Sequence, residues 1–172
     1  MNRVASVLIA WTVSAALMVP ALAAGAEQQP KAAPPSGTSE PYAPGLGEFM
    51  GTIQLRHAKL WFAGTSRNWP LAAYQLDELK EAFDDVTKFQ ANFQGRPIAK
   101  MVDANVKPPI DRLLVAIEAK DFPQFAAAFD ALTNGCNACH RGADHDFIVI
   151  QRPTAPPFTN QRFLPPDPRR AN

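Results

Sequence analysis

The sequence has only two cysteines, no excess of charge of either sign and no internal repeat. Because Cys136 and Cys139 are the only cysteines among 172 residues, the second cysteine pair of a four-cysteine zinc site is missing. The chain has 17 lysines and arginines against 16 aspartates and glutamates, a formal net charge of +1, without a basic stripe or a long charged run. This balance argues against a nucleic-acid partner.

The two cysteines that are present belong to the segment Cys136-Asn137-Ala138-Cys139-His140, which has the form C-x-x-C-H. This spacing is the attachment signal of a covalently bound c-type haem. The two thiols form thioether bonds to the haem vinyl groups, and the histidine that follows them binds the iron as the proximal ligand. On a helix these three side chains leave from one face. We therefore predict haem c, with its iron, as the cofactor.

Three other interpretations of the motif are weaker. A thioredoxin-like redox pair normally follows a strand at the start of a helix, whereas a helical segment precedes this pair. A zinc site would need a second pair of ligands, and the chain has no second cysteine pair. A disulfide between positions i and i+3 of an ideal helix is strained. A structural or interaction protein without haem stays open as a further alternative, in which the two cysteines are free or disulfide-bonded.

The first 26 residues have the features of a secretory signal peptide. A positive charge at Arg3 precedes an apolar run over 4–19, and small residues at 21–23 and 24–26 offer cleavage sites. The run is too short for a confident membrane span. We predict that 1–26 is removed, that the mature protein has no stable membrane insertion, and that it is periplasmic, which agrees with covalent haem attachment to an exported chain. An uncleaved N-terminal anchor stays open as the alternative.

Proline-rich segments lie on both sides of the central region. Residues 27–45 contain five prolines among small and polar residues, which predicts a disordered linker. Residues 143–172 are also rich in proline and follow no helical pattern, although 147–150 is β-prone. Apolar residues such as Phe158 and Phe163 indicate that this tail wraps around the preceding domain, near the haem.

The region 46–142 has a helical pattern in four segments. In the first segment, 46–64, apolar residues are spaced alternately by four and three, and we expect Gly64 to end it. The second segment opens at Asn68, a favourable N-cap residue, and we expect it to end at Gly95.

The third segment, 98–120, is interrupted by Pro108 and Pro109, which predicts a kink or two separate helices. Its expected core-facing residues are Ile110, Leu113, Leu114 and Ile117. The fourth segment starts at Asp121, and Gln124 three residues later completes a variant of the capping box.

An unbroken apolar seam with spacings of three and four runs along the fourth segment and ends at the two cysteines. Its members are Phe122, Phe125, Phe129, Leu132, Cys136 and Cys139. The cysteines therefore point into the core, where a haem would be buried. Four amphipathic segments with short connections predict an all-α fold, an antiparallel four-helix bundle over 46–142 with an extended proline-rich C-terminal tail.

An exported four-helix bundle with C-x-x-C-H near the end of its last helix resembles the cytochrome c′ family and its low-spin relatives. The resemblance covers roughly residues 46–142. It implies that Cys136 and Cys139 form the thioethers, that His140 is the proximal ligand, and that haem c lies between the helices near one end of the bundle. The proline-rich tail departs from the family, whose chains usually end soon after the haem-binding helix.

The mature chain offers four candidates for the sixth iron ligand: Met50, His57, Met101 and His145. In an antiparallel bundle the start of the first helix lies beside the end of the last, so Met50 stands near the level of His140. The resemblance also implies a methionine of the first helix. His57 lies ~10.5 Å further along the same stripe and is the alternative. Met101 ranks third, and His145 ranks last because it would have to cross the plane of the haem.

The predicted function is that of a periplasmic monohaem c-type cytochrome that carries single electrons between redox partner proteins and is not an enzyme. The alternative is a cytochrome c′-like protein that binds or senses nitric oxide or carbon monoxide at an open haem site. Peroxidase activity lacks support because no distal histidine and arginine pair occurs at a recognisable spacing. Arg56 and Arg141 are candidates to pair with the haem propionates. Bundle cytochromes often dimerise, so a homodimer stays open.

Overall fold

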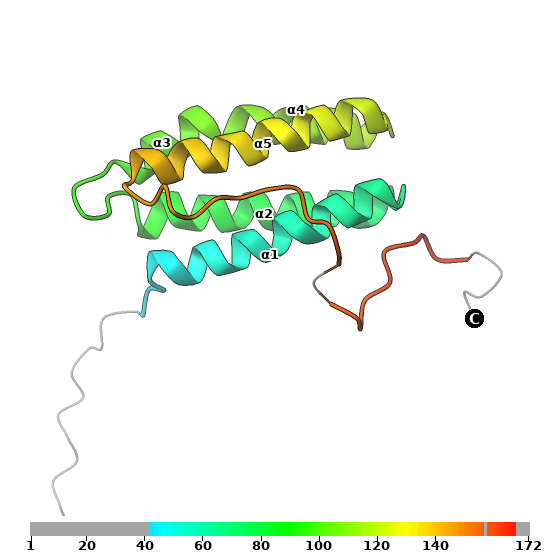
Figure 1. The fold of residues 1–172 in the computed structure, drawn as a ribbon, viewed down its shortest axis with the longest axis horizontal. Coiled ribbons are helices and arrows are strands. Elements are labelled where there is room, and N and C mark those ends of the chain that lie inside the picture. The colour runs from blue at the N-terminus through cyan, green and yellow to red at the C-terminus, as the bar shows by residue number, and fades with distance from the viewer. Residues whose placement is uncertain (1–41, 157, 168–172) are drawn as a thin grey trace, which may run out of the picture. The chain divides into compact units, whose positions relative to one another are not determined.

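The computed structural model describes residues 42–156 and 158–167. Over these residues the chain forms five helices and no strand (Figure 1), which confirms the all-α expectation. The helices are α1 (Leu46–Thr65), α2 (Trp69–Phe89), α3 (Ile98–Asn105), α4 (Lys107–Glu118) and α5 (Phe122–Gly142). The predicted signal peptide and most of the predicted linker lie outside the described residues.

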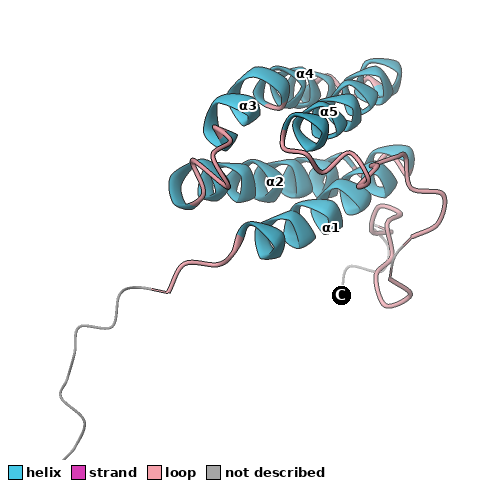
Figure 2. Ribbon diagram, turned by 60° about the vertical axis from the view of Figure 1, so that its left-hand side comes forward, coloured by secondary structure: helices cyan, strands magenta, loops and turns pink. Residues whose placement is uncertain are grey.

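The helices pack mainly in two pairs, α1 against α2 and α4 against α5. Figures 1 and 2 show both pairs, with α3 beside the end of α5 that carries the cysteines. A shared apolar core joins them, and its largest fully buried side chains include Phe125, Phe129, Leu60, Leu79, Leu113 and Leu132. A Cβ on Gly135 of α5 would lie 2.2 Å from the carbonyl oxygen of Asn105, so this glycine permits a close approach of α3 to the end of α5 that carries the C-x-x-C-H segment.

None of the helices in the described part of the chain combines the length and the apolar character that crossing a membrane requires.

Two helix starts follow the sequence signals. The Asn68 side chain accepts a hydrogen bond from the backbone N–H of Leu71 at 3.3 Å. The Asp121 carboxylate accepts one from the backbone N–H of Gln124 at 3.0 Å. The Gln124 amide donates back to the Asp121 carboxylate at 2.8 Å rather than to its backbone, so the pair is a variant of the capping box. Both predicted N-caps are confirmed.

The end of α1 differs from the prediction, because Gly64 lies inside the helix. The chain leaves α1 through a left-handed residue, Arg67, with φ 56°. A Cβ on Gly64 would lie 2.2 Å from the Phe125 ring, so this glycine makes room for a core aromatic side chain of α5. The absence of a side chain at position 64 therefore serves packing between helices and does not end the helix.

Two further expectations need correction. The second helix ends at Phe89 rather than at Gly95, and the loop that follows closes through an isolated bridge between Phe93 and Arg96. Leu114 was expected in the core but is 46% exposed, because it points away from the face that buries its neighbour Leu113.

The third segment is divided into two helices, as predicted. The break is at Val106, directly before α4, whose first turn contains Pro108 and Pro109. Proline is tolerated there because the first backbone N–H groups of a helix have no intrahelical partner.

Candidate functional site

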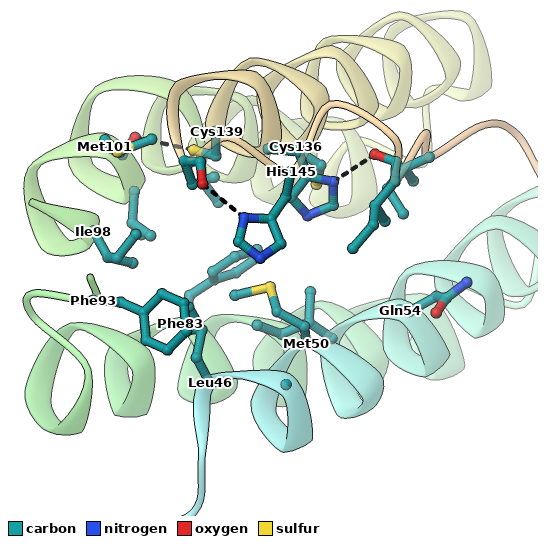
Figure 3. A pocket seen from close by; sticks show the side chains of 18 of the residues that line it. Leu46, Met50, Gln54, Phe83, Phe93, Ile98, Met101, Cys136, Cys139 and His145 are labelled. Carbon is teal, nitrogen blue, oxygen red and sulfur yellow. Dashed lines mark hydrogen bonds between the residues drawn. The ribbon is translucent and has the colours of Figure 1, made fainter. Parts of the chain in front are cut away.

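A cavity of about 430 Å³ opens among α1, α2, α3, α5 and the chain that follows α5. All five site residues predicted from the sequence line it: Met50, His57, Cys136, Cys139 and His140. Most of the remaining wall is apolar. The volume lies within the ~300–1,000 Å³ typical of cofactor and small-molecule pockets. Figure 3 shows the cavity, with Met50 rising from α1 and the cysteines on α5 opposite.

Cys136 is buried, Cys139 is half-buried, and no disulfide joins them. The Cys139 thiol donates a hydrogen bond to the carbonyl oxygen of Met101 at 3.4 Å. Burial, and secondarily the neighbouring Cys139, raises the pKa of Cys136 to about 12, and burial also raises the pKa of Cys139. Both thiols are therefore protonated at neutral pH. This is the reverse of the lowered pKa that characterises a reactive redox cysteine pair.

The His140 ring is held by the backbone of the chain after α5. Its Nδ1 lies 2.8 Å from the carbonyl oxygen of Ile148. A carbonyl oxygen only accepts, so Nδ1 carries a hydrogen, and in the neutral ring the lone pair is on Nε2. Histidines that bind metals commonly donate their other ring N–H to a carbonyl in this way. The geometry therefore prepares Nε2 to bind a metal.

His57 is buried, with 3% of its surface exposed, and it contacts α5 in two ways. Its Nε2 lies 2.9 Å from the Thr133 hydroxyl, and its ring centroid lies 4.3 Å from that of Phe129. Because the Thr133 hydroxyl donates to the Phe129 carbonyl at 3.0 Å, its oxygen accepts from Nε2–H of His57. Burial lowers the pKa of His57 to about 4, so the ring is neutral at neutral pH.

Met50 differs from His57 because no hydrogen bond in the described part of the chain engages its side chain. It is half-buried and lines the cavity. Figure 3 shows its sulfur directed toward the cavity interior. Of the two predicted sixth ligands, Met50 therefore has its donor atom available, whereas the Nε2 of His57 is engaged with Thr133.

The structure brings Met101 and His145 into the same cavity. His145, ranked last from the sequence, enters it from the chain after α5 (Figure 3), and its Nδ1 donates to the Ala143 carbonyl at 2.7 Å. Arg56, expected near a haem propionate, is instead bound to α2, with an ion pair to Glu78 at 2.5 Å. Arg141 is exposed and does not line the cavity.

Sequence reasoning expected the tail near the site but did not identify which residues after α5 line it. Ile148 and Ile150 line the cavity, and Asn137 makes two hydrogen bonds to the backbone of Ile150. Every residue has a backbone carbonyl, so the sequence does not indicate which carbonyl accepts a hydrogen bond from the site. The only available signal was Asn137 itself, a polar residue inside the C-x-x-C-H motif on a face next to the core.

No family model matches the chain, and neither a curated protein nor a solved structure matches it. Among the described residues, no group of three or more His, Cys, Asp or Glu side chains is placed to hold a bare metal ion.

Proposed function

We propose that the protein is a periplasmic monohaem c-type cytochrome that carries single electrons between redox partner proteins and catalyses no bond chemistry. One observation carries this proposal: the complete C-x-x-C-H motif faces a largely apolar cavity in which the Nδ1–H of His140 is already bonded to a carbonyl. In this role Cys136 and Cys139 hold haem c through thioethers, and His140 binds its iron through Nε2. When bound, the haem supplies a one-electron couple.

Residues of the chain would set the properties of that couple. Most of the cavity wall is apolar, and burial with axial ligation and hydrogen bonding determines the reduction potential. The Ile148 carbonyl fixes the His140 tautomer. Met50 is the sixth ligand in this proposal, because its sulfur is free of competing bonds. His57 is the alternative ligand, and it would have to give up its hydrogen bond to Thr133.

The fold that we propose for this function is an antiparallel four-helix bundle of the cytochrome c′ type, in which α3 and α4 together are the third helix. Short connections between the helices and the packing of α1 on α2 and of α4 on α5 support it. The position of the motif in the last two turns of α5 also supports it. The sequence features of 1–26, which predict a cleaved signal peptide, support the periplasmic location.

The test is expression of the full chain together with a haem-attachment system. We expect haem staining to survive a denaturing gel, and to be lost when Cys136→Ser and Cys139→Ser are combined. We expect a sharp low-spin spectrum of the reduced protein that carbon monoxide leaves unchanged. Absence of covalent haem from the wild type would refute the proposal. A high-spin spectrum that shifts with carbon monoxide would favour gas binding over electron transfer.

Two methionines that line the cavity provide a matched comparison for the sixth ligand. Met50→Ala is expected to open the iron to carbon monoxide and to remove the weak far-red absorption band of methionine-ligated ferric haem. Met101→Ala is expected to leave both properties unchanged. If His57→Ala and not Met50→Ala opens the iron, His57 is the ligand.

A further inference from the structure

The chain turns back on itself directly after α5 and lies against the helix end that carries the haem motif. We call residues 143–150 the return segment. Its first turn is a Schellman motif: the N–H of His145 donates to the His140 carbonyl at 2.8 Å, and the N–H of Asp144 donates to the Arg141 carbonyl at 3.3 Å. Asp144 takes the left-handed conformation that this motif requires, with φ 59°. A second turn follows, in which the Ile148 N–H donates to the His145 carbonyl at 2.9 Å.

The far end of the return segment is held by one side chain of α5. The Asn137 amide donates to the Ile150 carbonyl at 2.9 Å and accepts from the Ile150 N–H at 2.8 Å. One amide therefore satisfies both backbone groups of one residue and fixes the register of the segment along the helix. A carboxylate cannot donate the first bond, and a shorter hydroxyl cannot span both groups.

We call the two hydrogen bonds between Asn137 and Ile150 the clamp. The clamp lies next to His140, the proposed proximal ligand. Asn137 precedes His140 by three residues, so both side chains lie on the same side of α5. Ile148, whose carbonyl accepts from Nδ1–H of His140, is two residues from the clamped Ile150. Holding Ile150 therefore holds the acceptor of the histidine hydrogen bond at 2.8 Å.

We propose that Asn137 is a positioning residue for the iron ligand, acting through the return segment on the ring of His140. This inference rests on the proposed haem function. The bond from Nδ1–H to a fixed carbonyl sets the ring orientation and increases the basicity of Nε2. A more basic ligand favours the ferric state, so the clamp keeps the reduction potential lower than that of the same site without it.

A second anchor allows this role to be separated from general support of the tail. Beyond Ile150, Arg152 forms a bidentate pair with Asp130 at 2.5 and 2.6 Å, and its guanidinium lies 4.5 Å from the centre of the Trp61 ring. Asp130→Ala removes this anchor without touching Asn137, Ile148 or Ile150. Both variants loosen the tail, but only Asn137→Ala releases the acceptor of the His140 hydrogen bond.

The experiment compares wild type, Asn137→Ala and Asp130→Ala as haem-loaded proteins. In Asn137→Ala we expect solvent exchange of the His140 Nδ1 proton, followed by NMR, to be about tenfold faster than in the wild type, together with a higher reduction potential. Asp130→Ala is expected to match the wild type in both.

The outcomes separate this inference from the proposed function. If the wild type carries covalent haem but Asn137→Ala changes neither the proton exchange nor the reduction potential, the positioning role alone is overturned. Any loss of stability in that variant would then be merely structural. Equal changes in Asn137→Ala and Asp130→Ala would also overturn it. Absence of covalent haem from the wild type would refute the proposed function and this inference with it.

Discussion

Two histidines that line one cavity differ in what they can do, because each ring nitrogen finds a different partner. In His140 a carbonyl takes Nδ1–H and leaves Nε2 with a free lone pair. In His57 the Thr133 hydroxyl takes Nε2–H, and the ring packs against Phe129 in the core. The residue type is the same, and the hydrogen-bond partner decides whether the ring can bind a metal through Nε2 or supports the packing of α1 on α5.

The buried neutral state of His57 makes stability depend on pH. Its pKa is about 4 in the folded chain, lowered by burial from an ordinary 6.5. Between these values the unfolded state binds a proton that the folded state excludes, so the free energy of unfolding falls as the pH drops below about 6.5 and stops falling below about 4. From pH 7.5 to pH 5 we expect a loss of about 2 kcal/mol from this residue.

Urea unfolding at both pH values measures this loss, with His57→Gln as the control. A glutamine amide can still donate to Thr133 but does not titrate, so the variant is expected to lose less stability on acidification than the wild type. Groups other than His57 contribute equally to both proteins. An identical pH dependence in the two proteins would contradict a buried neutral His57.

At the scale of the helices, three ends use left-handed residues that are not glycine. Arg67, Lys120 and Asp144 have φ values of 56°, 54° and 59°. The residue after each of them has a separate role, since Asn68 and Asp121 cap the following helices and His145 enters the cavity. Short Schellman turns of this kind keep the connections tight, and they place side chains that the cavity and the next helix need.

The turn after α4 predicts a stabilising substitution. Lys120 is exposed and left-handed, a conformation that costs a residue with a Cβ roughly 1–2 kcal/mol and costs glycine almost nothing. We expect Lys120→Gly to raise the free energy of unfolding by about 1 kcal/mol. The matched control is Lys80→Gly in the middle of α2, where glycine in a helix is expected to cost about 1 kcal/mol. Chemical denaturation of both variants measures the difference, and destabilisation by Lys120→Gly would contradict the role given to this turn.

These turns explain which element boundaries could be predicted from the sequence. Asn68 and Asp121 were predictable because their short polar side chains bond directly to the first free N–H groups of a helix. The C-terminal ends of α1 and α4 could not be located by looking for glycine, the usual left-handed residue there. Arg67 and Lys120 adopt this conformation instead, which their residue types rarely do. Gly64, the expected end of α1, is a glycine because Phe125 of a distant segment occupies the space beside it.

At the scale of the whole molecule, the candidate site combines side chains that the sequence pattern identifies with backbone groups that it does not identify. Cys136, Cys139 and His140, which line the cavity, were singled out because their C-x-x-C-H spacing is the one that haem attachment requires. Met50 and His57 were predicted from chain direction, and both line the cavity. The roles of Ile148 and Ile150 were not predictable, because they depend on backbone atoms and on where the return segment lies.

The C-terminal tail continues over α1, as its apolar residues suggested. Phe163 is buried, with 7% of its surface exposed, and its ring lies 5.6 Å from that of Phe62. Its carbonyl accepts a hydrogen bond from the Asn68 amide at 3.0 Å. Phe158 is 38% exposed, and its ring faces the ammonium group of Lys59 at 5.0 Å. The attachment of the tail to α1 therefore depends mainly on Phe163.

Substitutions on α1 test this attachment while leaving the tail sequence intact. Removing the Phe62 ring deprives Phe163 of an aromatic contact worth roughly 0.5–1.5 kcal/mol beyond the buried area, and of the buried area itself. Because cleavage follows the population of the open tail, Phe62→Ala is expected to increase the rate of trypsin cleavage after Arg162 about tenfold. Lys59→Ala, which removes the weaker contact to Phe158, is expected to change that rate less than about twofold.

Mass spectrometry of the released fragment identifies the cleavage site, and circular dichroism checks that the helices of both variants remain folded. Rapid cleavage after Arg162 in the wild type would show that the tail is free in solution, whatever the variants do. Slow cleavage in the wild type with a selective increase in Phe62→Ala would show that one buried aromatic side chain fastens the tail. The Arg152 pair and the Asn137 clamp hold the chain before this point, so release at Phe163 is expected to leave the surroundings of His140 unchanged.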